Sequence, residues 1–120
     1  MARILIVEDD PGYQELIELL TRPHLSRICN NAEEAEGCLA SEPFDAVICD
    51  IDLLGISGLE LLRRMQSQGL TKRVPVVICS ASSDETVKSA ALKGGAAAFI
   101  AKPFEHEALK LVMSRLLVGA

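Results

Sequence analysis

The sequence predicts a single α/β domain built on a doubly wound, five-stranded parallel sheet with helices on both faces. Three observations predict this fold class. Five short apolar runs of strand length recur along the chain, segments with helical spacing separate them, and no hairpin turn joins one run to the next. Near-continuous apolar strands need cover on both faces, which helices give to a parallel sheet. A chain of 120 residues fits one domain, expected over residues 1–120.

The expected strands are residues 4–7, 25–29, 46–49, 76–79 and 97–101, of which the second is the weakest. Helical signals follow the first strand, where Pro11 suits a first helical turn. The apolar residues of that segment fall on one helical face and are Tyr13, Leu16, Ile17 and Leu20.

The later helices have start and end signals of their own. Asn31 with Glu34 has the spacing of a capping box, although Ser or Thr is more usual there. Ser83, followed by Asp84 and Glu85, suits another helix start, and Gly94 suits a helix end. Apolar residues at helical spacing also mark two further segments, and these are Leu59, Leu62 and Met65, then Leu109, Val112, Met113, Leu116 and Leu117.

Charge and hydropathy limit the possible partners. The net charge is -5 with a pI near 5.0, and Lys and Arg are scattered, so we expect no direct binding of nucleic acid. Only four apolar residues separate Arg3 from the acidic triplet at 8–10, and no apolar segment approaches membrane-spanning length. We therefore expect no signal peptide and no membrane association, and the cytoplasm is the expected location.

The four cysteines are Cys29, Cys38, Cys49 and Cys79. They contain no CxxC pair, and two of them lie inside apolar runs. We expect reduced thiols in the core and not a disulfide or a metal site.

Polar residues follow four of the expected strands. In an open parallel sheet the carboxyl ends of the strands meet at one edge, beside a topological switch point, so these residues are expected to lie together. They are Glu8, Asp9 and Asp10 after the first strand, Asp50 and Asp52 after the third, Ser80 after the fourth and Lys102 after the fifth.

Such an acidic cluster needs a cation. Two carboxylates about 4 Å apart repel by roughly 4 kcal/mol at an effective dielectric of about 20. Mg²⁺ takes one or two carboxylates and keeps positions for water and phosphate oxygens, which suits Asp9 and Asp50. Asp50 could then attack a phosphoryl donor, and Lys102 and Ser80 could meet the charge of the acyl phosphate.

Each of these residues also has a plainer interpretation. Asp10 or Asp52 alone is more often a helix cap or a turn former. Lys102 alone is usually a solvated surface lysine, and Ser80 a turn hydroxyl. Their joint placement at one edge favours the functional interpretation.

With these residues the chain resembles, over essentially its whole length, the receiver domain of two-component response regulators of the chemotaxis-regulator type. The resemblance rests on the acidic pair in ILIVEDD, the segment DAVICDIDLLGISGLELL, the strand VPVVICSAS, the run GAAAFIAKPF and the spacing between them. It implies a flavodoxin-like sheet with strand order 2-1-3-4-5 and five flanking helices. It also implies a phosphoaccepting signalling domain that catalyses only its own phosphorylation and dephosphorylation.

By position, the resemblance makes Asp50 the phosphoacceptor, which receives a phosphoryl group from a histidine kinase or a phosphotransfer protein. It implies Mg²⁺ as cofactor, bound directly by Asp9 and Asp50. Glu8 would bind the ion through water, and Asp52 through its backbone carbonyl.

The resemblance also implies a switch that acts on a downstream effector. Ser80 would hydrogen-bond the phosphoryl group, Lys102 would form an ion pair with it, and Phe99 would change rotamer. The Lys102–Pro103 bond is expected to be cis, and the output face is expected to be the fourth helix, fifth strand and fifth helix, at about residues 83–117.

Some positions depart from the family pattern. Leu54 stands where the family commonly has proline, and Ser57 where an acid is frequent. The segment 96–99 lacks the acidic pair that receivers attached to winged-helix DNA-binding domains usually carry for dimerisation. We therefore expect a monomer or a weak dimer.

Three other functions compete with this one. A phosphatase of the haloacid dehalogenase class has a DxD motif like that of Asp50 and Asp52, but there the motif opens a longer chain and a further acidic motif follows the lysine. A flavodoxin-like binding module needs a phosphate-cradling loop after its first strand, where acids stand here. A degenerate receiver would bind partners constitutively, yet every position expected for phosphorylation holds a competent residue type.

Overall fold

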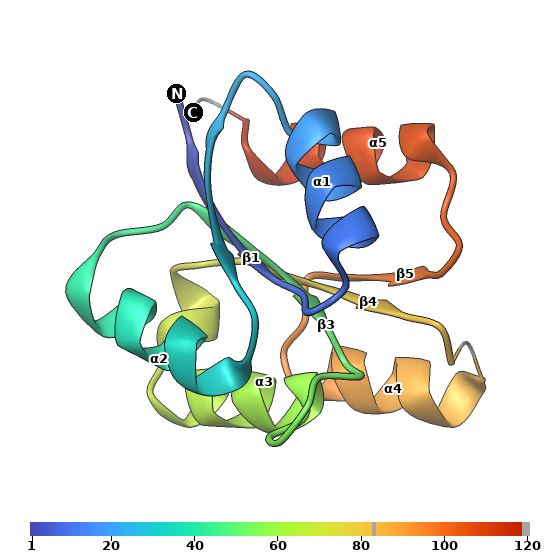
Figure 1. Ribbon diagram of the computed structural model, residues 1–120. Coiled ribbons are helices and arrows are strands. Elements are labelled where there is room, and N and C mark those ends of the chain that lie inside the picture. Colours follow the sequence, from blue (N-terminus) through green and yellow to red (C-terminus); the bar gives the residue numbers. More distant parts are fainter. Residues whose placement is uncertain (83, 119–120) are drawn as a thin grey trace.

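The computed structural model describes residues 1–82 and 84–118, which form five parallel strands and five α-helices in alternation (Figure 1). The strand order is β2-β1-β3-β4-β5, which confirms the predicted fold class and topology. A short 3₁₀ helix, η1 (Leu70–Lys72), was not predicted. In chain order the other elements are β1 (Arg3–Val7), α1 (Pro11–Leu20), β2 (Leu25–Cys29), α2 (Ala32–Ser41), β3 (Ala46–Asp50), α3 (Gly58–Ser67), β4 (Val76–Ser80), α4 (Glu85–Lys93), β5 (Ala98–Ala101) and α5 (His106–Leu116).

Helices cover both faces of the sheet. Helices α1 and α5 lie on one face, and α2, α3 and α4 lie on the other (Figure 1). Successive strand residues alternate between the two, so in β1 the side chains of Ile4 and Ile6 pack with α1 and α5, and those of Leu5 and Val7 pack with α2 and α3. This two-sided burial explains why the central strands are apolar at nearly every position.

The two edge strands are less buried. Strand β2 is an edge strand beside β1, and Leu25 at its start is 62% exposed, which explains the weaker apolar run at this place in the sequence. At the other edge, β5 has a single buried residue, Ile100, while Phe99 is half-buried.

The predicted helix starts are present, with differences in detail. Pro11 occupies the first turn of α1. Asn31 caps α2 by accepting a hydrogen bond from Glu34 N at 2.8 Å, but the Glu34 carboxylate accepts from Asn30 N at 3.3 Å and not from Asn31 N. The capping box predicted there is thus only half formed, because the glutamate bonds to the residue one position earlier.

Helix α4 begins and ends close to the predicted residues. Asp84 caps it by accepting a hydrogen bond from Val87 N at 2.9 Å, and Ser83, also predicted at this start, lies outside the described residues. Gly94 is the C-cap in a right-handed conformation, whereas Gly95 has a φ of 102° and takes the left-handed position where glycine is favoured. The helix exit therefore needs the second glycine of the pair.

All four cysteines are buried and free of disulfides, which confirms the prediction of core thiols. Cys29 Sγ lies 3.5 Å from Cys38 Sγ across the packing of β2 on α2. Burial raises the pKa of the Cys29 and Cys79 thiols to about 12, so both are neutral at ordinary pH. Among the described helices, none is long and apolar enough to cross a membrane.

Candidate functional site

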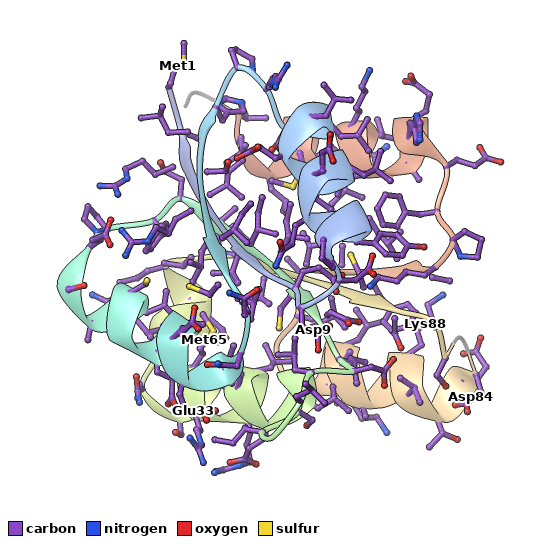
Figure 2. All side chains as sticks on the ribbon, viewed as in Figure 1. Met1, Asp9, Glu33, Met65, Asp84 and Lys88 are labelled. Atoms are coloured by element: carbon purple, nitrogen blue, oxygen red, sulfur yellow. The ribbon has the colours of Figure 1, made fainter. Side chains whose placement is uncertain are left out.

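The acids that follow β1 and β3 meet at the carboxyl edge of the sheet. The two strands are parallel neighbours with Val7 opposite Cys49, so the residues that follow, Glu8 and Asp50, are held side by side. Carboxylate oxygens of Glu8, Asp9 and Asp50 all lie within 4.8 Å of one another. Figure 2 shows Asp9 at this edge, where β1 ends. The structure thus brings together the acids that the sequence predicted to be close.

These three acids differ in burial. Glu8 is 1% exposed and Asp50 is 5% exposed, while Asp9 is half-buried. They share a surface pocket of about 320 Å³, called here the acidic pocket. Its lining residues are Glu8, Asp9, Asp10, Tyr13, Asp50, Asp52, Ala81, Lys102 and Pro103.

Lys102 is the cation of the acidic pocket. Its Nζ donates a hydrogen bond to Glu8 Oε1 at 2.5 Å and lies 3.4 Å from Asp50 Oδ1, and its side chain is 8% exposed. The contact to Asp50 does not have hydrogen-bond geometry, so Asp50 Oδ1 is a buried oxygen without a hydrogen-bond partner among the described residues. Lys102 therefore lies in the site, as predicted, but it bonds to Glu8, which the sequence did not indicate.

Burial and charge set the protonation of this pair. Burial raises the pKa of Glu8, and the hydrogen bonds from Lys102 and from Asp10 N offset only part of that effect. Burial acts to lower the pKa of Lys102, but the hydrogen bond to Glu8 and the negative charges of Asp50 and Glu8 raise it above its ordinary value. Lys102 is therefore protonated at ordinary pH. Ionisation of Glu8 beside it is opposed by burial.

The remaining predicted acids lie at the rim. Asp10 is exposed and caps α1 by accepting a hydrogen bond from Tyr13 N at 2.9 Å, so the plainer interpretation holds for this residue. Asp52 is exposed and lines the acidic pocket, but its carboxylate is not part of the three-acid cluster. A contribution of its backbone carbonyl stays a prediction.

Ser80 and Phe99 lie on the neighbouring strands. Ser80 is fully buried at the end of β4, and its Oγ accepts a hydrogen bond from Ser82 N at 3.0 Å. Phe99 packs, half-buried, against the apolar cluster under α2, α3 and α4. The Lys102–Pro103 peptide bond is cis, as the resemblance implied.

Two residues of the site were missed from the sequence. Tyr13 was expected only as a residue on the apolar face of its helix, yet its ring centroid lies 4.0 Å from Lys102 Nζ. Gly58 opens α3 and packs on the strand end, where a Cβ atom would come within 2.1 Å of Asp50 O. For Gly58, the available signal was a glycine at the start of an otherwise apolar helical segment. No sequence signal indicated that Tyr13 contacts Lys102.

The donor set of the pocket fits a hard divalent cation. The clustered acids Glu8, Asp9 and Asp50 each offer a carboxylate oxygen within 4.8 Å of the others, and Asp50 Oδ1 has no hydrogen-bond partner in the described part of the chain. Oxygen-only sites of this size suit Mg²⁺ and not the thiophilic metals. The residues present therefore fit the ion that the sequence predicted.

Comparison with known proteins identifies the family. Residues 4–114 match the family model of the response regulator receiver domain. The chain belongs to this family. A receiver is a phosphoaccepting signalling module, phosphorylated on an aspartate, and not an enzyme in its own right. Receivers interact with histidine kinases, and the cluster of Glu8, Asp9 and Asp50 is typical of the Mg²⁺ site of receivers.

Relatives include a stand-alone receiver and much longer proteins. The receiver is 28% identical over 121 residues to protein PilH of Pseudomonas aeruginosa, covering 99% of this chain and 100% of PilH. It is 35% identical over 117 residues to response regulator protein PilR of the same species, covering 96% of this chain. The receiver spans only 26% of the length of PilR, and the same share of transcriptional regulatory protein ZraR of Klebsiella oxytoca.

Solved structures agree in fold. A Chloroflexus aurantiacus J-10-fl protein assigned as a response regulator matches with a TM-score of 0.90 at 34% identity, over 98% of each chain. The signal receiver domain of a signal transduction histidine kinase from Syntrophus aciditrophicus matches with a TM-score of 0.89 at 29% identity, over 100% of this chain and 92% of that one. The receiver fold is thus shared along the full described length.

Proposed function

We propose that Asp50 accepts a phosphoryl group from a histidine kinase or a phosphotransfer protein in a Mg²⁺-dependent reaction, and that residues 1–120 form one receiver domain. The observation that carries this proposal is the state of the Asp50 carboxylate. It is 5% exposed at the floor of the acidic pocket, and its Oδ1 has no hydrogen-bond partner among the described residues. Since buried polar atoms are nearly always hydrogen-bonded, an unpaired carboxylate oxygen on a residue that lines a pocket suits a reactant better than a structural residue.

The chemistry is a phosphoryl transfer to a carboxylate. An Asp50 oxygen forms a bond to phosphorus while the bond from phosphorus to the donor's histidine nitrogen breaks, and that nitrogen keeps the electron pair. The product is an acyl phosphate on Asp50. Catalysis of such a step rests mainly on positioning and on charges near the transferred group.

Lys102 and Ser80 are proposed to meet the charge of the phosphoryl group. Lys102 Nζ is already 3.4 Å from Asp50 Oδ1. Ser80 follows Cys79, which is opposite Asp50 in the register of β3 and β4, so its hydroxyl belongs to the adjacent strand end. An ammonium and a hydroxyl next to the acceptor are the donors that a phosphoryl oxygen needs.

Glu8, Asp9 and Asp50 are proposed to hold Mg²⁺, with Glu8 acting through water and Asp52 through its backbone carbonyl. Once bound, the ion supplies positive charge that offsets the crowded carboxylates and the phosphoryl oxygens. The geometric support is the cluster of carboxylate oxygens within 4.8 Å of one another. The protein's own contribution is to hold these acids in place through the pairing of β1 with β3.

Intact-mass measurement after incubation with acetyl phosphate and Mg²⁺ tests this proposal. We expect wild type to gain the mass of one phosphoryl group, and Asp50→Asn to gain none. A sample treated with a chelator should gain none either. Asp45→Asn is a matched control, because Asp45 lies before β3 at the opposite edge of the sheet, and it should behave as wild type. Phosphorylation of Asp50→Asn would refute Asp50 as the acceptor.

We further propose that phosphorylation switches the binding of a downstream effector through Ser80, Phe99 and the α4–β5–α5 face. Phe99 is opposite Ile78 in the register of β4 and β5, and both pack on the side of the sheet that α4 covers. By alternation along β4, Ser80 points to the same side as Ile78. If the loop that follows Ser80 moves toward a phosphoryl group on Asp50, the space available to the half-buried ring of Phe99 changes as well.

Amide NMR spectra recorded with and without acetyl phosphate test the switch. In wild type we expect resonances of α4, β5 and α5 to shift on phosphorylation. In Phe99→Ala the resonances near Asp50 should still shift, while those of α4 and α5 should shift much less. Equal shifts of α4 and α5 in both proteins would show that Phe99 has no part in the coupling.

A further inference from the structure

Tyr13 is an aromatic residue of the acidic pocket to which the proposed function gives no role. It lies in the first turn of α1 and lines the pocket together with Glu8 and Asp50. Its ring centroid is 4.0 Å from Lys102 Nζ. The side chain is only half-buried, although the sequence placed it on the apolar face of its helix. Contact with Lys102, and not only packing in the core, therefore accounts for the position of the Tyr13 ring.

Lys102 has lost nearly all contact with water. Its side chain is 8% exposed, and its Nζ lies 2.5 Å from Glu8 Oε1, 3.4 Å from Asp50 Oδ1 and 4.0 Å from the centroid of the Tyr13 ring. An ammonium is strongly hydrated, so burying it requires groups that replace the water. The face of an aromatic ring attracts a cation electrostatically, most strongly where water is excluded. The ring therefore completes the surroundings of the ammonium.

The Tyr13 ring is itself held in place. Phe104, in the loop between β5 and α5, packs against it with ring centroids 5.8 Å apart and an interplanar angle of 48°. The backbone of Tyr13 is fixed by its N–H, which donates to the Asp10 cap. Tilted aromatic pairs of this kind are stabilising beyond the area they bury. Tyr13 thus lines the pocket with its ring packed between Phe104 and Lys102.

We propose that Tyr13 is a positioning residue for phosphoryl transfer to Asp50: its ring holds the Lys102 ammonium next to the acceptor through a cation–π contact. Glu8 alone would draw the ammonium away, because it accepts the shorter contact, while Asp50 has no hydrogen bond from it. The ring gives the ammonium a third fixed neighbour and covers it from water. This inference rests on the proposed function, because it assigns Tyr13 to the same reaction.

Phosphorylation rates of Tyr13 variants test the role of the ring. With acetyl phosphate and Mg²⁺, we expect Tyr13→Leu to be phosphorylated about fivefold more slowly than wild type, as for loss of a moderate cation–π contact. Tyr13→Phe keeps the ring and should stay within about twofold of wild type. Leu19→Ala is a control on the exposed surface of the same helix, where Leu19 is 52% exposed. A wild-type rate in Tyr13→Leu, or an equal loss in Tyr13→Phe, would overturn the inference.

A double-mutant cycle separates an effect through Lys102 from a general loss of structure. In a Lys102→Met background, followed over longer incubation, Tyr13→Leu should cause no further loss of rate. A further loss of about fivefold there would mean that Tyr13 does not act through Lys102.

A spectroscopic readout needs neither metal nor phosphoryl donor. The ring next to Lys102 Nζ should shift the resonances of the Lys102 ε-methylene protons upfield in wild type and in Tyr13→Phe, and this shift should be absent in Tyr13→Leu. If wild type shows no ring-current shift, the contact does not form in solution and the inference fails. If the shift is present and wild type is phosphorylated, but Tyr13→Leu keeps the full rate, only the positioning role is refuted and the proposed function stands. If wild type takes no phosphoryl group, both fail.

Discussion

The acidic pocket and the outer surface of α3 both pair a glutamate with a basic side chain, but the pKa of the glutamate shifts in opposite directions at the two places. On α3, the surface carboxylate of Glu60 accepts hydrogen bonds from Arg63 and Arg64, which lower its pKa to about 2. In the pocket, Glu8 accepts a hydrogen bond from Lys102, yet burial raises its pKa. A basic neighbour at hydrogen-bond distance is common to both places. The difference lies in water, which stabilises a surface ion and is missing from a buried one.

The two regions also differ in how their charges balance. On the surface of α2 and α3, Arg64 bonds both Glu60 and Glu36, so cations and acids alternate. The pocket gathers three clustered carboxylates, of Glu8, Asp9 and Asp50, and Lys102 is the one basic residue among the described residues that line it. A surplus of acidic side chains in a pocket does not stabilise a fold. Such a cluster therefore indicates a site that binds a cation or reacts with an electrophile. Four substitutions test this contrast.

Gly58→Ala should have the largest effect. A Cβ at this position would come within 2.1 Å of Asp50 O and 2.9 Å of Ile51 Cα, so the backbone that carries the acceptor must move. We expect the free energy of unfolding to fall by about 3 kcal/mol, as for severe overpacking. Urea denaturation measures this change, and phosphorylation by acetyl phosphate should slow as well.

Gly37→Ala is the matched variant on the α2 surface. Gly37 lies inside the helix and is exposed, and apart from its chain neighbours and the nearby backbone of its own helix, the described residues place no atom within 4 Å of the added Cβ. Alanine is the better helix former, so the free energy of unfolding should rise by about 0.5–1 kcal/mol. If Gly37→Ala and Gly58→Ala lose the same stability, the loss in Gly58→Ala is not caused by close packing against the Asp50 backbone.

Asp9→Asn should stabilise the metal-free protein. Removing one of three crowded carboxylates reduces repulsion, and we expect a gain of about 1 kcal/mol in the free energy of unfolding. Adding Mg²⁺ should stabilise wild type but not Asp9→Asn, because only a protein that binds the ion gains stability from it. Glu36→Gln is the surface control and should lose slightly in stability and keep the response to Mg²⁺. A full response in Asp9→Asn would contradict the proposed metal site.

Glu60→Gln should have the smallest effect, and one that depends on pH. The folded pKa of Glu60 is lowered from 4.5 to about 2, so its contribution to stability is present above about pH 4.5 and is lost as the pH falls toward 2. Glu60→Gln should therefore be less stable than wild type near neutral pH, and this difference should shrink on acidification. Urea titrations across that pH range measure this difference in stability.

The pH dependence has the opposite sign for Glu8. Its pKa is raised, so its ionisation above about pH 4.5 destabilises the fold.

Much of this architecture follows from local patterns in the sequence. Apolar runs predicted the strands within a residue or two of their observed bounds, because two-sided burial keeps the middle of β1, β3 and β4 apolar and leaves the polar residues Arg3, Asp50 and Ser80 at the strand ends. The meeting of Glu8, Asp9 and Asp50 was also predictable, since parallel strands bring their carboxyl ends to one edge. The weak second run was less clear because an edge strand is half exposed.

Other contacts depend on side-chain packing that no local pattern contains. Lys102 and Glu8 are 94 residues apart, and their hydrogen bond exists only because β5 and β1 end near the same pocket. The approach of Tyr13 to Lys102 depends on how α1 is tilted over the sheet. The tight contact of Gly58 with the Asp50 backbone likewise needs the path of the loop between β3 and α3.

The unpaired oxygen of Asp50 bears on how readily this residue reacts. A carboxylate whose lone pairs are all occupied by N–H groups is a poor nucleophile, because bonds to its donors must break before a new bond can form. Here the lysine is near enough to steady the charge, but Asp50 Oδ1 keeps a lone pair uncommitted. A backbone amide hydrogen-bonded to that atom would occupy one of its lone pairs and make the aspartate a weaker nucleophile.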